Sequence, residues 1–264
     1  MIIGDSISGS GANMTLMKGS RLILNEGSKL HIGSNSSFHL ESNAIVELNG
    51  GLVIIHPGGQ LHQDANSQLI VHGHGSVKLV GTQANWLSRG DLLLTEADTL
   101  LVGGEEGIGA GTWNWSGNQV YTYLGPNSLL DINPDQSNGC DIILPYNSGH
   151  LIQGGGHIRL HSTNIHLSES CNFQIETTNQ FEDCFLSGTG HTSVVSCFGR
   201  SNWNGGGLEH IRLDAFAPGI ASFKASGFSA LDLWLETNGA GVQLNEIEFL
   251  SSHANLNHLA ENSW

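Results

Sequence analysis

The 264-residue chain has few charged side chains, and few of those are basic. Charged residues make up 12% of the sequence, and 9 Lys and Arg residues stand against 24 Asp and Glu, for a formal net charge of −15. Nucleic acids and anionic membrane surfaces are bound through clusters of basic residues. The composition therefore argues against both as partners.

Long apolar runs are missing as well. No stretch reaches the roughly 18 apolar residues that a membrane-spanning helix requires, so we expect no insertion into a membrane. The first residues, Met1–Ser6, have neither the basic region nor the long apolar region of a secretory signal peptide.

Cysteine is scarce, and its spacing excludes two common uses. The four residues Cys140, Cys171, Cys184 and Cys197 form no C-x-x-C pair, so neither a zinc ribbon nor a thioredoxin-like site is indicated. Two alternatives stay open. The thiols are buried as small apolar groups, which we favour, or they form disulfides, which would imply export.

What the chain does contain is glycine, 36 residues of it, and a repeated apolar-x-apolar triplet. Leu22-Ile23-Leu24, Leu30-His31-Ile32 and Phe38-His39-Leu40 begin 8 residues apart, and Gly, Asn and Ser fill the intervals. Alternate residues of a strand face opposite sides, and Gly and Asn tolerate the positive φ of tight corners. A hairpin meander would need longer strands. The pattern instead predicts an all-β fold, a right-handed parallel β-solenoid with triangular coils of about 24 residues.

Such a coil length predicts which side chains stack on one another in successive coils. The inward columns are expected to hold Leu22 with Val46 and Leu69, and Leu30 with Val53 and Val77. The outward columns are expected to hold Thr15 with His39 and His62, and Ile23 with Glu47 and Ile70. Because these outward columns are mixed, they lack the regular Thr array of an ice-binding face.

The regularity divides the chain into three segments of one continuous solenoid. Residues 1–81 are regular coils, 82–140 are irregular coils with loop insertions, and 141–264 are wider, looped coils that run to an uncapped end. In the middle segment, strands are expected at 92–94, 99–102, 119–123 and 129–132. A solenoid needs capped ends, so we expect the chain to be part of a longer polypeptide.

Two stretches carry a family resemblance. The repeats in 27–33 and 49–61 resemble the G-x-L-x-I repeats of large secreted surface proteins of Bacteroidetes-type bacteria. The stretch from Gly207 to Trp264 resembles the right-handed parallel β-helix repeats of the same proteins and of the pectate-lyase-like superfamily. The resemblance implies an exported protein at the cell surface or outside the cell.

Candidate site residues are sparse. If the chain is an enzyme, its catalytic residues are expected among the carboxylates and basic groups between 182 and 214. Asp183, His191 and Arg212 resemble the Asp, Gly-His and basic positions of polygalacturonase-like enzymes. The paired Asp motif of those enzymes is absent. Glu209 completes that set. An aromatic surface for glycans is expected at Trp113, Trp115 and Trp203, although aromatics that cap loosely packed coils are the favoured alternative for the first two. We expect no metal site beyond opportunistic Ca²⁺ and no cofactor.

These observations favour a structural or adhesive role. We expect a rigid stalk or a carbohydrate- or surface-binding module of an exported bacterial surface protein, with polysaccharides or host surface glycans as partners. The main alternative is a polysaccharide-active β-helix enzyme, either a glycoside hydrolase or a lyase. A trimeric fibre is a further alternative, for which Ile23 and Ile70 supply part of an apolar outer strip.

Overall fold

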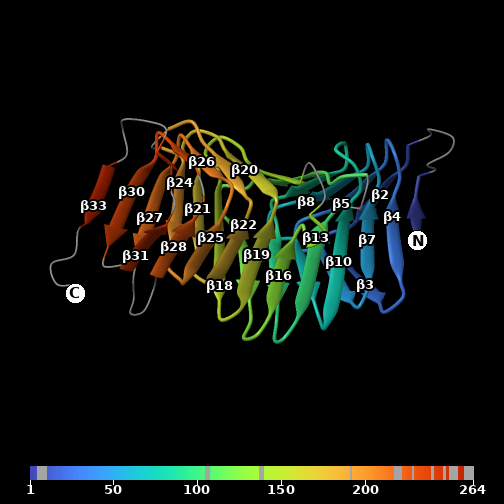
Figure 1. The fold of residues 1–264 in the computed structure, drawn as a ribbon. Coiled ribbons are helices and arrows are strands. Elements are labelled where there is room, and N and C mark those ends of the chain that lie inside the picture. Colours follow the sequence, from blue (N-terminus) through green and yellow to red (C-terminus); the bar gives the residue numbers. More distant parts are fainter. Residues whose placement is uncertain are drawn as a thin grey trace.

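The chain folds into an elongated β-solenoid (Figure 1). The computed structural model describes residues 1–4, 11–104, 108–136, 140–190, 192–216, 222–227, 229–238, 241–245, 248–249 and 255–258. Their strands form three sheets of 11 strands each, and every strand pair within the sheets is parallel. The predicted parallel solenoid is therefore confirmed, with coils of about 23 residues.

The strands occur in chain order as one from each sheet in turn. Sheet A contains β1 (Ile2–Ile3), β4 (Lys29–Ile32), β7 (Leu52–Ile55), β10 (His74–Leu79), β13 (Thr99–Gly103), β16 (Leu129–Ile132), β19 (His157–His161), β22 (Thr178–Glu182), β25 (Ser201–Asn204), β28 (Ser222–Ser226) and β31 (Gly241–Asn245). Sheet B contains β2 (Asn13–Leu16), β5 (Ser37–Leu40), β8 (Gln60–Gln63), β11 (Asn85–Ser88), β14 (Thr112–Trp115), β17 (Cys140–Leu144), β20 (Thr163–Leu167), β23 (Phe185–Ser187), β26 (Gly207–Glu209), β29 (Ser229–Leu231) and β32 (Glu248–Phe249). Sheet C contains β3 (Arg21–Asn25), β6 (Ile45–Asn49), β9 (Gln68–Val71), β12 (Asp91–Leu94), β15 (Val120–Leu124), β18 (Gly149–Gly154), β21 (Asn172–Ile175), β24 (Val194–Cys197), β27 (Arg212–Phe216), β30 (Trp234–Asn238) and β33 (Asn255–His258).

The columns predicted from the coil length are confirmed by the strand registers. Leu22 pairs with Val46 and Val46 with Leu69, while Leu30, Val53 and Val77 form a second inward column. The two outward columns also form as predicted, with Thr15, His39 and His62 in one and Ile23, Glu47 and Ile70 in the other. Inward residues from all three sheets meet in one continuous apolar core.

Asparagine and glycine turn the corners, as the spacing of these residues predicts. Asn43 and Asn66 have φ values of 63° and 64°, a left-handed conformation that asparagine tolerates better than most residues. They belong to successive coils, and the Asn43 amide donates to the Asn66 carbonyl over 3.2 Å. The corners therefore stack with backbone hydrogen bonds, as the strands do.

The middle segment keeps the same three sheets and contains the widest coils. All four strands expected there form, as β12, β13, β15 and β16, and β11 and β14 are two that the sequence did not indicate. Thr99 pairs with Leu129, 30 residues later, whereas His157 pairs with Thr178, 21 residues later. The extra width expected of the C-terminal coils thus lies in the middle segment, because the loop insertions between strands are there.

The structure also describes the four cysteines and the length of any helix. All four cysteines are buried free thiols, which supports the favoured alternative over disulfides. Among the described residues, no helix is long and apolar enough to cross a membrane.

Candidate functional site

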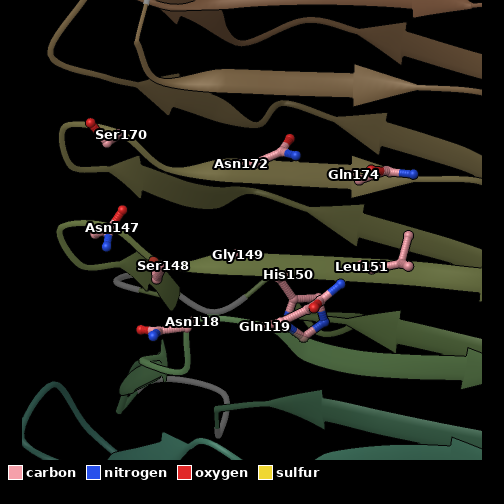
Figure 2. Close-up of a pocket in the computed structure, with 10 residues that line it drawn as sticks. All are labelled: Asn118, Gln119, Asn147, Ser148, Gly149, His150, Leu151, Ser170, Asn172 and Gln174. Atoms are coloured by element: carbon pink, nitrogen blue, oxygen red, sulfur yellow. The ribbon is translucent and has the colours of Figure 1, made fainter.

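A polar pocket of about 230 Å³ opens where the chain passes from sheet B to sheet C (Figure 2). Three successive coils contribute to it, through the corners before β15, β18 and β21 and through residues of β18 and β21. The lining consists of Asn118, Gln119, Asn147, Ser148, Gly149, His150, Leu151, Ser170, Asn172 and Gln174.

The fold of the corners and strands explains how these side chains reach the pocket. Asn147 and Ser170 have φ values of 59° and 60°, and they lie at equivalent corners of successive coils. Along β21, Phe173 is buried, so strand alternation turns its neighbours Asn172 and Gln174 outward. Figure 2 shows Asn172 and Gln174 on one strand and the corner residues Asn147 and Ser170 one above the other.

The pocket offers uncharged hydrogen-bonding groups. None of its lining residues is Asp, Glu, Lys or Arg. Gln174 donates to Glu176 over 2.8 Å, whereas the exposed amides of Asn118, Gln119 and Asn172 have no hydrogen-bond partner within the described part of the chain. Each free amide carries both donors and an acceptor, and a sugar hydroxyl needs the same combination from its partners.

His150 forms the inner boundary of the pocket and is almost fully buried, with 2% of its surface exposed. Its ring stacks on Trp115, with the ring centroids 3.8 Å apart, and its Nε2 lies 2.9 Å from Thr122 Oγ1. Burial lowers the pKa of His150 to about 3, so the ring is neutral at physiological pH. The pocket therefore has a rigid, uncharged inner side.

The three tryptophans expected at a glycan-binding surface lie in the core instead. Trp113, Trp115 and Trp203 have 1%, 0% and 3% of their surface exposed. Strand alternation turns Trp113 and Trp115 to the same, inward side of β14, where Trp86 stacks on Trp113 at 4.2 Å. Phe181 stacks on Trp203 at 4.3 Å. These rings belong to the core, where a glycan outside the solenoid cannot reach them.

The residues proposed for an enzyme are not assembled into one site. Asp183 turns the corner before β23 with a φ of 51°, whereas Glu209 ends β26 beside Ser187. Because Asp183 precedes β23 and Glu209 pairs with Ser187 at the end of that strand, the two carboxylates lie at opposite ends of the strand pair. Arg212 lies in sheet C and donates to Asp214 and Glu236 over 2.8 Å and 2.6 Å. His191 lies outside the described residues.

A different group of titratable side chains does converge, on the outer face of sheet A. His161 Nε2 lies 3.1 Å from Asp131 Oδ1, and His161 Nδ1 lies 3.0 Å from Glu182 Oε2. Burial raises the pKa of Asp131, against the opposing effect of His161 and Arg159. Within the described residues, no group of His, Cys, Asp and Glu has the arrangement of a metal site. The sequence concealed this cluster because its members come from coils of unequal length.

Comparison with known proteins adds little. No protein-family model matches the chain, and no curated protein matches it. Among solved structures, it is similar to one titled "Crystal structure of TibC-catalyzed hyper-glycosylated TibA55-350 fragment", with 10% sequence identity over 97% of both chains and a TM-score of 0.29. A likeness at that TM-score says nothing about function, and the β-solenoid is shown by the parallel strand pairing itself.

Proposed function

We propose that the chain is a rigid structural and adhesive module of a surface-exposed protein, and that it binds uncharged glycans at the amide pocket. Stacked coils that hydrogen-bond along every strand suit a stiff spacer. The observation that carries the binding role is the pocket itself, where three successive coils present neutral amides and hydroxyls side by side.

The charge of the chain narrows the class of glycan. The chain has a net charge of −15, and no residue that lines the pocket is Lys or Arg, so the pocket offers no cation to offset the carboxylates or sulfates of acidic polysaccharides. Neutral sugars have no charge that needs a cation, and their hydroxyls can form hydrogen bonds with amides, which both donate and accept. The proposed surface location rests on the resemblance of the repeats to those of secreted surface proteins.

Binding to a panel of neutral and acidic oligosaccharides, measured by calorimetry, tests this function. Asn172→Ala and Gln119→Ala each remove a free amide from the pocket and should raise the Kd for a neutral ligand about three- to tenfold. Asn202→Ala removes a partly exposed amide on sheet A and should leave the Kd unchanged. Preference for acidic glycans, or equal effects of all three substitutions, would overturn the proposal.

A second candidate function, cleavage of polysaccharides, is favoured by the cluster of Asp131, His161 and Glu182. Burial raises the pKa of Asp131, which suits a proton donor, and Glu182 is positioned by Gln180, whose Nε2 donates to its Oε1 over 2.5 Å. Release of new reducing or unsaturated ends from the same panel tests this function. Activity that survives both Asp131→Asn and Glu182→Gln would remove the cluster from consideration.

A further inference from the structure

A trough of about 180 Å³ lies on the outer face of sheet B, away from the amide pocket. Strands β23, β26 and β29 form it, with Phe185, Gly207 and Ser229 in register along one column. Ser187, Glu209 and Leu231 form the neighbouring column. The trough therefore crosses three coils at a right angle to the strands.

Phe185 is the aromatic side chain of this trough, and 54% of its surface is exposed. Strand alternation buries its neighbour Leu186 and turns the Phe185 ring outward. The ring leans over Gly207, since a Cβ at that residue would lie 3.1 Å from Phe185 Cδ1 and 3.3 Å from Cε1. Glycine thus lets the ring lie against the sheet, and the ring remains accessible to solvent.

Hydrogen-bonding groups border the ring on one side. Glu209 has 54% of its side chain exposed, and its Oε1 lies 3.5 Å from His210 Nε2. Ser187, in register with Glu209, has its hydroxyl 2.8 Å from His166 Nδ1. An apolar ring therefore lies next to a column that offers a carboxylate and a hydroxyl.

We propose that this trough is a second glycan subsite, in which an uncharged pyranose stacks on Phe185 and donates hydroxyl hydrogens to Glu209. A pyranose has an apolar C–H face and a polar edge, and this pairing matches both. The Glu209 carboxylate disfavours an anionic sugar. A protein partner would need about 800 Å² of surface on each side, far more than a trough that holds a single sugar ring.

The subsite rests on the proposed glycan-binding function but uses different residues, so each can fail alone. Phe185→Ala should raise the Kd for neutral oligosaccharides of glucose, mannose or xylose about tenfold. Phe185→Trp should retain or improve binding because it keeps an aromatic platform. Tyr123→Ala removes an aromatic ring that is 42% exposed on sheet C and should have no effect.

Measuring these variants beside Asn172→Ala, by calorimetry and by saturation-transfer NMR of the sugar protons, separates the outcomes. Loss of binding with Phe185→Ala, recovered in Phe185→Trp, supports the subsite. Loss only with Asn172→Ala overturns the subsite and leaves the amide pocket standing. A wild-type chain that binds no sugar overturns both. If Phe185→Ala changes self-association in sedimentation but not sugar binding, the ring is a contact between copies and the subsite is wrong.

Discussion

His150 stacks on Trp115 inside the solenoid, with the ring centroids 3.8 Å apart and the planes 24° from parallel. Phe173 meets the same imidazole edge-on at 6.4 Å. An ionisable residue thus takes the place of an aromatic core residue. Burial lowers its pKa from 6.5 to about 3, so the native state accepts a proton there far less readily than the unfolded chain does.

This pKa difference predicts a loss of stability in mild acid. Above pH 6.5 the residue is neutral in both states and has no effect on the pH dependence. As the pH falls below 6.5, His150 binds a proton in the unfolded chain but not in the native state, so the free energy of unfolding declines. His150 alone should make it about 2 kcal/mol lower at pH 5 than at pH 8.

Urea denaturation of the wild type and of His150→Phe over that pH range checks the expectation. The substitution leaves the Thr122 hydroxyl without its imidazole partner, so the stability of the variant at pH 8 is not the readout. The readout is the slope of the free energy of unfolding against pH, compared between the wild type and His150→Phe. Parallel slopes between pH 8 and pH 5 would contradict the assignment of a neutral buried His150.

Asp98 is predicted to hold the corner between β12 and β13. Its carboxylate is 4% exposed and accepts hydrogen bonds from the Gly73 and Thr95 amides, over 2.6 Å and 2.7 Å, and from the Thr95 hydroxyl over 2.8 Å. Burial acts to raise the pKa of Asp98, but these hydrogen bonds outweigh it and lower the pKa below its usual value. Asp98→Asn should therefore reduce the free energy of unfolding at pH 7 by about 3 kcal/mol.

The sign of the pH effect follows from the direction of that shift. A carboxylate with a lowered native pKa stabilises the fold above its unfolded value, and the contribution disappears as the pH falls through the native value. The cost of Asp98→Asn should accordingly shrink below pH 4. Asp64→Asn alters a half-exposed corner carboxylate that pairs with His39, so it should change stability by less than about 0.5 kcal/mol. Equal costs for the two substitutions would argue against the role of Asp98.

The four thiols should be unreactive in the folded protein. Burial raises the pKa of Cys140 and Cys197 to about 12 and that of Cys184 to about 11, so thiolate is scarce at pH 8. A thiol-specific chromogenic reagent should therefore label fewer than one site per native chain. After denaturation without reductant it should label all four, and a lower final number would reveal disulfides that contradict the free thiols.

The sequence predicted the columns of the first coils because a constant interval of 8 residues between triplets defines both the corners and the register. It predicted the site poorly, for reasons that particular residues make clear. The sequence did not indicate β14, because glycines surround it, and so did not show that Trp113 and Trp115 face the core. Asp131 and His161 meet across an interval that loop insertions make irregular, so no fixed repeat length pairs them. The amide pocket depends on corners that stack only when the register is known.

The corners of successive coils stack closely at Gly125 and loosely at Gly155. A Cβ at Gly125 would collide with the backbone carbonyl oxygen of Thr95 in the preceding coil, and the Gly125 amide donates to the Leu94 carbonyl over 2.8 Å. This hydrogen bond holds the two backbones together at the corner, so Gly125→Ala should separate the two coils and cost about 3 kcal/mol or more. Gly155 is a suitable control, because its nearest neighbour would be Pro126 Cα at an ordinary 3.6 Å and its φ is not left-handed. Gly155→Ala should be neutral or stabilise by up to about 1 kcal/mol, through the reduced freedom of the unfolded chain. Thermal and urea unfolding of the pair measures the difference, and equal stabilities would mean that the coils are not packed as closely as the corner at Gly125 indicates.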